Sequence, residues 1–215
     1  QVTALVGADG VHEWPVAVVA LGGGPPALER SGAPAVGAVD ADPVEFPLAT
    51  EAQRAGDRDE LGEPWPAGEA VEVSLLESPP VETVVLSRSS QRRMDASREL
   101  PGDLLRTAFP AATRGISVPH RVVVNGVEGF EPGVYRWPEL ARAGNFREEL
   151  YRVALEQGLP RDAAFVVIGV TDVSALDDRE YREAQLAAGL VEGRLHLLAY
   201  ALGASASGMT FLDSD

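Results

Sequence analysis

The sequence predicts an α+β fold in which helices pack on a mostly antiparallel sheet. Two continuous apolar runs rich in valine, residues 14–21 and 163–170, have the length and composition of buried strands. From residue 81 onward, amphipathic helical patterns are interspersed with shorter strand patterns. Helices and strands mixed in this way are typical of a domain with a helix layer packed against a sheet.

Three helical patterns follow one another in the second half of the chain. The first begins at Val81, directly after two prolines that favour a helix start. The second follows Pro101, and its apolar face consists of Leu104, Leu105, Ala108 and Phe109. The third is an amphipathic pattern marked by Phe146, Leu150, Val153, Ala154 and Gln157.

A fourth and longer helix is predicted over residues 178–202. Asp177 and Glu180 have the spacing of a capping box at its start, and Gly203 is placed to end it. The helix carries small residues that would let another helix approach closely: Ala184, Ala187, Ala188, Gly189 and Gly193.

Strand patterns occur at residues 120–125, 133–137 and 208–213, in addition to the two apolar runs. A further short strand is expected at residues 71–76. These strands make up the sheet on which the predicted helices pack.

The region before residue 81 differs in composition from the rest. Residues 22–80 hold nine of the sixteen prolines, and residues 1–80 carry a net charge of −11 out of −15 for the whole chain. Proline and glycine at this density interrupt regular structure. We expect residues 23–80 to form an acidic linker or wrapping arm with at most short strands, and residues 81–215 to form a domain.

The composition excludes several classes of protein. The chain has 33 Asp and Glu against 18 basic residues, all of them Arg, which argues against a nucleic-acid or anionic-membrane partner. It has no cysteine, and its three histidines do not stand at metal-ligand spacing, so no metal site is expected. No apolar run approaches the roughly 18 residues of a membrane span. We expect a fragment of a longer cytoplasmic protein.

Residues 88–93 are a local cluster of positive charge at the end of the first predicted helix. Arg88, Ser90 and Arg92 stand at i, i+2 and i+4, and their guanidinium and hydroxyl groups suit a phosphate. The alternative is a solvated basic helix end that complements the helix dipole.

Residues 203–208 are a second candidate, a run of Gly, Ala and Ser after the long helix. Small residues let backbone N–H groups approach a ligand, but the same run also suits a simple helix cap and turn. The glycines at 22–24 are followed by two prolines and no helix, so they do not form a dinucleotide-binding loop.

Taken in order, these segments resemble the nitroreductase family of FMN-dependent oxidoreductases, in particular the branch of SagB-type dehydrogenases. The resemblance covers residues 81–215. It rests on the basic cluster 88–94, the loop 114–119, the hairpin-like segment 127–137 and the Arg-x-Tyr-Arg helix with its following strand, residues 179–213.

The resemblance implies a flavin site without a catalytic triad, because the cofactor carries the chemistry. Arg88 and Ser90 would hold the phosphate or ribityl chain, and Arg92 would reach the pyrimidine edge of the ring. Ser117 would belong to the shortened loop of the family. Three further cofactor contacts are implied near the flavin N5 atom: Ser207, Gly208 and Met209. The implied electron donor is NAD(P)H, and the acceptor is a small molecule or a peptide.

Residues 4–22 resemble the C-terminal tail of family members. The chain would then hold the tail of one nitroreductase-like unit in residues 1–22, the linker, and most of a second unit. The family pairs two subunits around the flavin, so a homodimer or an internal pseudo-dimer with the preceding unit is expected.

The chain also departs from the family pattern. The segment Gly-His-x-x-Gln-Asn is replaced by residues 189–194, which lose three polar groups, and the Lys-Tyr pair of azoline-oxidising members is replaced by Ala175 and Leu176. Two alternatives therefore remain: a degenerate, flavin-free scaffold or partner-binding protein in a modification complex, and a binding module unrelated to flavin.

Overall fold

The computed structural model describes residues 7–8, 10–15, 42, 44–56, 66–71 and 78–209. The chain divides into two compact units, residues 1–62 and 63–215. The sequence predicts a domain over residues 81–215, and that boundary stays a prediction. Within the second unit, a side chain on Gly68 would overlap the backbone of Gly115, so the chain at these two glycines is closely packed.

The first unit contains helix α2 (Pro47–Ala55), which the sequence does not predict. The expectation of at most short strands between residues 23 and 80 is therefore wrong at this point. Pro47 is in the first turn, where its missing N–H costs nothing, and the rest of the segment is rich in helix-forming residues. None of the residues of α2 is buried. The Thr50 hydroxyl donates a hydrogen bond to the backbone oxygen of Val11 at 3.1 Å.

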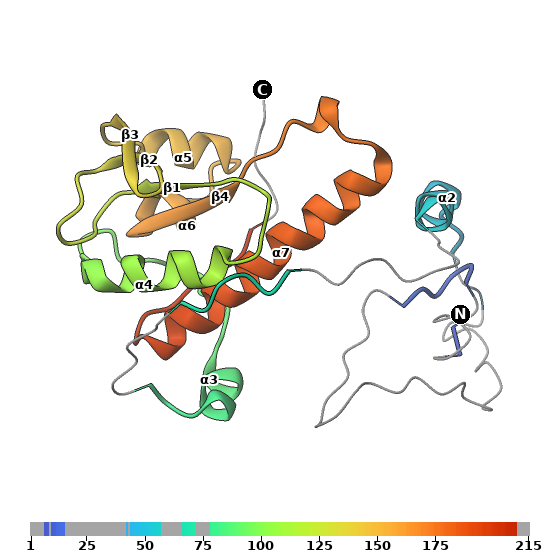
Figure 1. The fold of residues 1–215 in the computed structure, drawn as a ribbon, viewed down its shortest axis with the longest axis horizontal. Coiled ribbons are helices and arrows are strands. Elements are labelled where there is room, and N and C mark those ends of the chain that lie inside the picture. The colour runs from blue at the N-terminus through green and yellow to red at the C-terminus, as the bar shows by residue number, and fades with distance from the viewer. Residues whose placement is uncertain are drawn as a thin grey trace. The chain divides into compact units, whose positions relative to one another are not determined.

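The second unit is built on a four-stranded antiparallel sheet with the order β3-β2-β1-β4. Its strands are β1 (His120–Val124), β2 (Gly133–Arg136), β3 (Glu139–Ala143) and β4 (Phe165–Gly169). The α+β fold with an antiparallel sheet flanked by helices is thus confirmed (Figure 1).

The two faces of the sheet carry separate cores, because alternate side chains of a strand point to opposite faces. On one face, Val122 and Val124 of β1 pack with residues of α4 (Gly102–Thr113). On the other face, Val123 packs with Phe146 and Leu150 at the start of α5 (Arg147–Val153). The sheet is therefore covered by helices on both sides (Figure 1).

The remaining helices of this unit are α3 (Val81–Ser87), α6 (Gly158–Asp162) and α7 (Asp178–Ala201), with a 3₁₀ turn at Val173–Ala175. The long helix α7 packs against α4 and α3. Both halves of the predicted capping box are present, with Asp177 accepting from the Glu180 N–H and Glu180 accepting from the Asp177 N–H. Gly203 follows with a φ of +77°, which confirms the predicted helix end.

Two predicted elements differ from the structure. The third predicted helix ends at Val153 because Leu155 and Glu156 adopt the left-handed conformation, and α6 begins separately after them. The run 163–170 forms β4, but β4 is a half-exposed edge strand rather than a fully buried one.

The sequence does not predict β3. Its residues have high helix propensity and are all exposed, and it becomes a strand through antiparallel pairing with β2. The predicted strands at 14–21, 71–76 and 208–213 fall largely outside the described residues. Within the described part of the chain, no helix has the length and apolarity needed to cross a membrane.

Candidate functional site

The basic segment, residues 88–93, leaves helix α3 instead of forming its last turn. The helix ends at Ser87, and Arg88 is extended, with φ and ψ of −62° and 143°. Ser90 then forms a parallel bridge with Ala206. The expected helix end is thus corrected: Arg88 and Ser90 belong to an extended chain, in which residues two apart share one side.

Two side chains of α7 hold this segment through one backbone oxygen. Tyr200 donates from its hydroxyl to the carbonyl of Ser89 at 2.8 Å, and His196 donates to the same oxygen from Nε2 at 3.0 Å. The two rings stack, with centroids 5.7 Å apart. His196 is therefore held in place by packing and one hydrogen bond, at the edge of α7 that faces the basic segment.

The Tyr200 oxygen also accepts hydrogen bonds. Its single proton is directed to the Ser89 carbonyl, so the Ser89 hydroxyl at 3.1 Å and the Gln91 side-chain amide at 2.8 Å donate to it. Burial raises the pKa of the Tyr200 phenol, but the hydrogen bonds with Ser89 and Gln91 and the charge of Arg88 outweigh it and leave that pKa below its ordinary value.

The segment after α7 lies beside the basic segment. The Gln91 backbone N–H donates to the carbonyl of Ala206 at 3.1 Å, and the hydroxyls of Ser90 and Ser207 are 2.9 Å apart. Residues 88–93 and 203–208 thus meet although they are more than a hundred residues apart in the sequence. The sequence analysis names each of them separately as a candidate binding segment.

A cleft of about 230 Å³ opens at this meeting point. Five of the residues that the resemblance implies as cofactor contacts line it: Ser90, Arg92, Ser207, Gly208 and Met209. Four residues that sequence reasoning did not name as contacts complete the lining: Gln91, Gln157, Leu159 and Glu192.

Two of the predicted contacts lie elsewhere. Ser117 is exposed in the turn after α4 and lines neither this cleft nor the neighbouring groove. Arg88 is exposed, near enough to Tyr200 for its charge to act on that phenol, and lines neither the cleft nor the groove. Their proposed roles toward a cofactor remain predictions.

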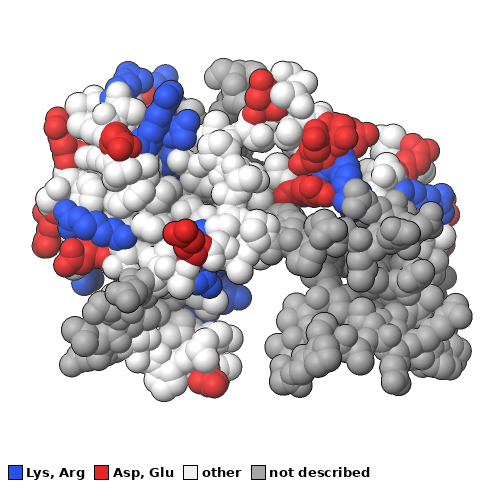
Figure 2. All heavy atoms as spheres, viewed as in Figure 1, with Lys and Arg blue, Asp and Glu red and all other residues white. Residues whose placement is uncertain are grey.

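The arginine side chains of the basic segment have no hydrogen-bond or ion-pair partner among the described residues. They are Arg88, Arg92 and Arg93, and all three are exposed. On the face drawn in Figure 2, arginine and acidic side chains are interspersed rather than gathered into one broad patch. The positive charge at the cleft is therefore local.

Glu192 enters the cleft from α7. An added Cβ on Gly208 would overlap the Glu192 carboxylate, so the absence of a side chain at Gly208 makes room for it. The sequence does not single out Glu192, which stands at an unspecified position of the replaced segment 189–194. Gln157 appears in the sequence analysis only as part of a helical pattern, and Leu159 has no sequence signal, because the start of α6 reaches the cleft only through the tertiary fold.

The cleft continues into a larger groove of about 860 Å³ between β4 and α7. Leu159, Glu192 and residues 207–209 line both, so they form the junction between them. Together the cleft and the groove have the volume of a site for a cofactor-sized ligand.

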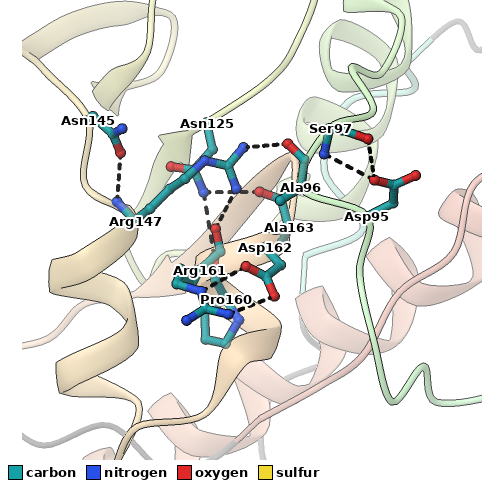
Figure 3. Close-up of polar contacts among 10 residues, drawn as sticks. All are labelled: Asp95, Ala96, Ser97, Asn125, Asn145, Arg147, Pro160, Arg161, Asp162 and Ala163. Carbon is teal, nitrogen blue, oxygen red and sulfur yellow. Dashed lines mark hydrogen bonds and ion pairs between the residues drawn. The ribbon is translucent and has the colours of Figure 1, made fainter.

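A network of hydrogen bonds braces the elements that carry the cleft (Figure 3). The guanidinium of Arg147 on α5 donates to the carbonyls of Ala96 and Arg161, and so joins the loop after the basic segment to α6. Asn125, after β1, donates to the Ala163 carbonyl at 3.0 Å. Arg161 and Asp162 pair in two contacts of 2.8 and 3.1 Å, and this pairing lowers the pKa of the Asp162 carboxyl.

Comparisons with known proteins bear on the fold that carries the cleft. No family model and no curated protein matches the chain. Among solved structures, it is similar to a protein provisionally named a nitroreductase from Anabaena variabilis ATCC 29413, with 27% identity and a TM-score of 0.51. The match covers 57% of this chain and 30% of that structure. The second unit thus has a nitroreductase-like fold, over less than a third of the length of the similar protein.

Proposed function

We propose that this chain is part of an FMN-dependent oxidoreductase of nitroreductase type that takes electrons from NAD(P)H. One observation carries the proposal. Two segments far apart in sequence, the basic segment and residues 207–209, meet at one cleft and bring to it the Arg92 guanidinium, the mutually hydrogen-bonded hydroxyls of Ser90 and Ser207, and the backbone of Gly208. The fold similarity to a nitroreductase supports the same function.

The donor set fits the phosphate and sugar-alcohol part of FMN. The Arg92 guanidinium can neutralise a phosphate, and the Ser90 and Ser207 hydroxyls can bond to phosphate or ribityl oxygens. The cleft is small for a whole cofactor, and the groove that continues from it supplies the further volume.

Ser90 and Arg92 would hold the anionic end of the cofactor, with Arg88 adding positive charge nearby, and residues 207–209 with Leu159 would line the path to the groove. This differs from the resemblance, which would place Arg92 at the pyrimidine edge of the ring. When bound, FMN supplies the redox chemistry, receiving a hydride from NAD(P)H and passing electrons to a small organic acceptor or a modified peptide. The residues of this chain bind the cofactor, orient it and exclude water from one side.

Membership of the SagB-type branch and a tandem arrangement are part of the proposal. They rest on the ordered motifs of residues 81–215 and on the tail-like sequence of residues 4–22. A second subunit or a preceding nitroreductase-like unit would then cover the side of the flavin that this chain leaves exposed.

A flavin-free scaffold or partner-binding protein is the second candidate, and one observation favours it. The Glu192 carboxylate occupies the space beside Gly208 in the cleft where an anionic ligand would approach the backbone. In that case the fold would be kept for a partner instead of a cofactor.

Flavin retention distinguishes the two candidates. The purified chain is reconstituted with excess FMN, desalted, and examined for an absorbance band near ~450 nm that bleaches with NAD(P)H. The R88A/R92A double variant should lose the retained flavin, whereas R136A/R152A, which removes two exposed arginines that line neither the cleft nor the groove, should keep it. A chain that stays colourless after reconstitution would favour the scaffold.

A further inference from the structure

The cleft contains one side chain of each charge. Arg92 lines it from the basic segment and Glu192 lines it from α7. The two do not form an ion pair within 4.0 Å, and neither side chain forms a hydrogen bond or ion pair with any other residue that the structure describes. A cation and an anion therefore share a cavity of about 230 Å³ without neutralising each other by direct contact.

Glu192 has a defined place in this cavity. Gly208 leaves the space that its side chain occupies, because a Cβ at that position would overlap the carboxylate. The same carboxylate lies at the junction with the groove, so a ligand that extends from the cleft into the groove must pass it.

Opposite charges at two sides of a small cavity favour a ligand with complementary charges at its two ends. A ligand that is anionic throughout gains from Arg92 but meets repulsion at Glu192. A ligand with an anionic group and a cationic or N–H group is attracted by both Arg92 and Glu192. Selection against the wrong ligand comes from the repulsive contact as much as from the attractive one.

We propose that the cleft selects amphoteric ligands, with Arg92 and Ser90 holding an anionic group and Glu192 holding a cationic or N–H group. The proposal rests on the proposed function in taking Arg92 as the anion contact, and it deepens that function by making Glu192 the specificity-determining residue.

The test uses two compact probes that share a phosphate and differ in the second group. Phosphoethanolamine carries an ammonium group and phosphoglycolate carries a carboxylate. Binding of each to the full chain is measured by isothermal titration calorimetry, with FMN in a third arm. The variants are E192Q, which keeps the size and shape of an exposed side chain, and E183Q, which removes the same charge from a part of α7 that does not line the cleft.

The parent chain should bind phosphoethanolamine about tenfold or more tightly than phosphoglycolate. E192Q should reduce this preference to less than about threefold, chiefly by improving phosphoglycolate binding, and E183Q should leave it unchanged. If E192Q changed the affinity for both probes by the same factor, the proposal would be overturned. Glu192 would then act only through its net charge and would not distinguish the second group of the ligand. The absence of binding of either probe to any variant would also overturn it.

The FMN arm separates this inference from the proposed function. If the parent chain binds phosphoethanolamine selectively but does not bind FMN, the selectivity of the cleft stands and the flavin function fails. If FMN binds but the two probes show no preference that depends on Glu192, the flavin function stands and this inference fails.

Discussion

The hydroxyl of Tyr200 donates a hydrogen bond to the backbone oxygen of Ser89 at 2.8 Å, across 111 positions of sequence. His196 donates to the same oxygen from one turn earlier on α7. The long helix therefore sets the position of the basic segment, and with it the position of the cleft wall that Ser90 and Arg92 form.

Replacing Tyr200 with Phe should loosen this connection. The variant loses the bond to Ser89 and the acceptor of the Gln91 amide, and we expect about 1–2 kcal/mol of destabilisation in urea unfolding together with weaker FMN retention. Tyr151→Phe is the matched control, since that phenol lies under the Arg161 guanidinium, forms no hydrogen bond among the contacts described, and lines neither the cleft nor the groove. Equal losses in both variants would show that Tyr200 has no special role.

The capping box at the start of α7 is a second test. Asp177→Ala removes the acceptor of the Glu180 N–H, which is 2.7 Å away, and should lower the free energy of unfolding by about 1 kcal/mol. Asp178→Ala, one position later, removes the same charge but not the cap, and should cost only a few tenths of a kcal/mol. Urea titrations of the two variants check the difference.

Two glycines should respond to alanine in opposite directions. Gly189 on α7 has no atom within 4 Å of an added Cβ, so Gly189→Ala should stabilise the chain by up to about 1 kcal/mol through helix propensity. At Gly133 in β2, an added Cβ would lie 2.5 Å from the carbonyl oxygen of Arg142, so Gly133→Ala should destabilise by about 1–3 kcal/mol. Thermal or urea unfolding gives both signs, and a loss of stability in Gly189→Ala would indicate an additional packing partner for this face of α7.

His120 should make stability depend on pH below neutrality. Burial lowers the pKa of its imidazole, although the hydrogen bond to the Val118 carbonyl partly opposes this shift. The folded pKa is thus below the ordinary value of 6.5, and the unfolded chain takes up the proton first as the pH falls. Stability is therefore complete above about pH 6.5 and declines below it.

Substitution of His120 by Gln should flatten this decline. The free energy of unfolding is measured by urea titration between pH 7.5 and 5.5, where the ordinary carboxyl groups remain ionised. Parallel slopes for the parent chain and the His120→Gln variant would exclude this histidine as the source.

Much of the fold of the second unit could be predicted from the sequence because its elements have strong local patterns. The helix after Pro101 and the capped helix α7 have clear periodicity and start signals, and β1 is a compact apolar run. Strand β3 could not be predicted in this way, since its exposed residues favour a helix and only pairing with β2 makes them a strand. Helix α2 lies in a region whose proline content suggested an irregular linker.

The candidate site, like the fold, could be predicted from the sequence only in part. The sequence by itself singled out two of the segments that line the cleft, because guanidinium and hydroxyl groups at close spacing in residues 88–93 and small residues at 203–208 are local properties. Only the tertiary structure decided that Ser90 meets Ser207, that α6 contributes Leu159, and that Glu192 shares the cleft with Arg92. These contacts join residues brought together by the packing of α7 and α6 around the sheet, and no local pattern records distances between segments that are far apart in the chain.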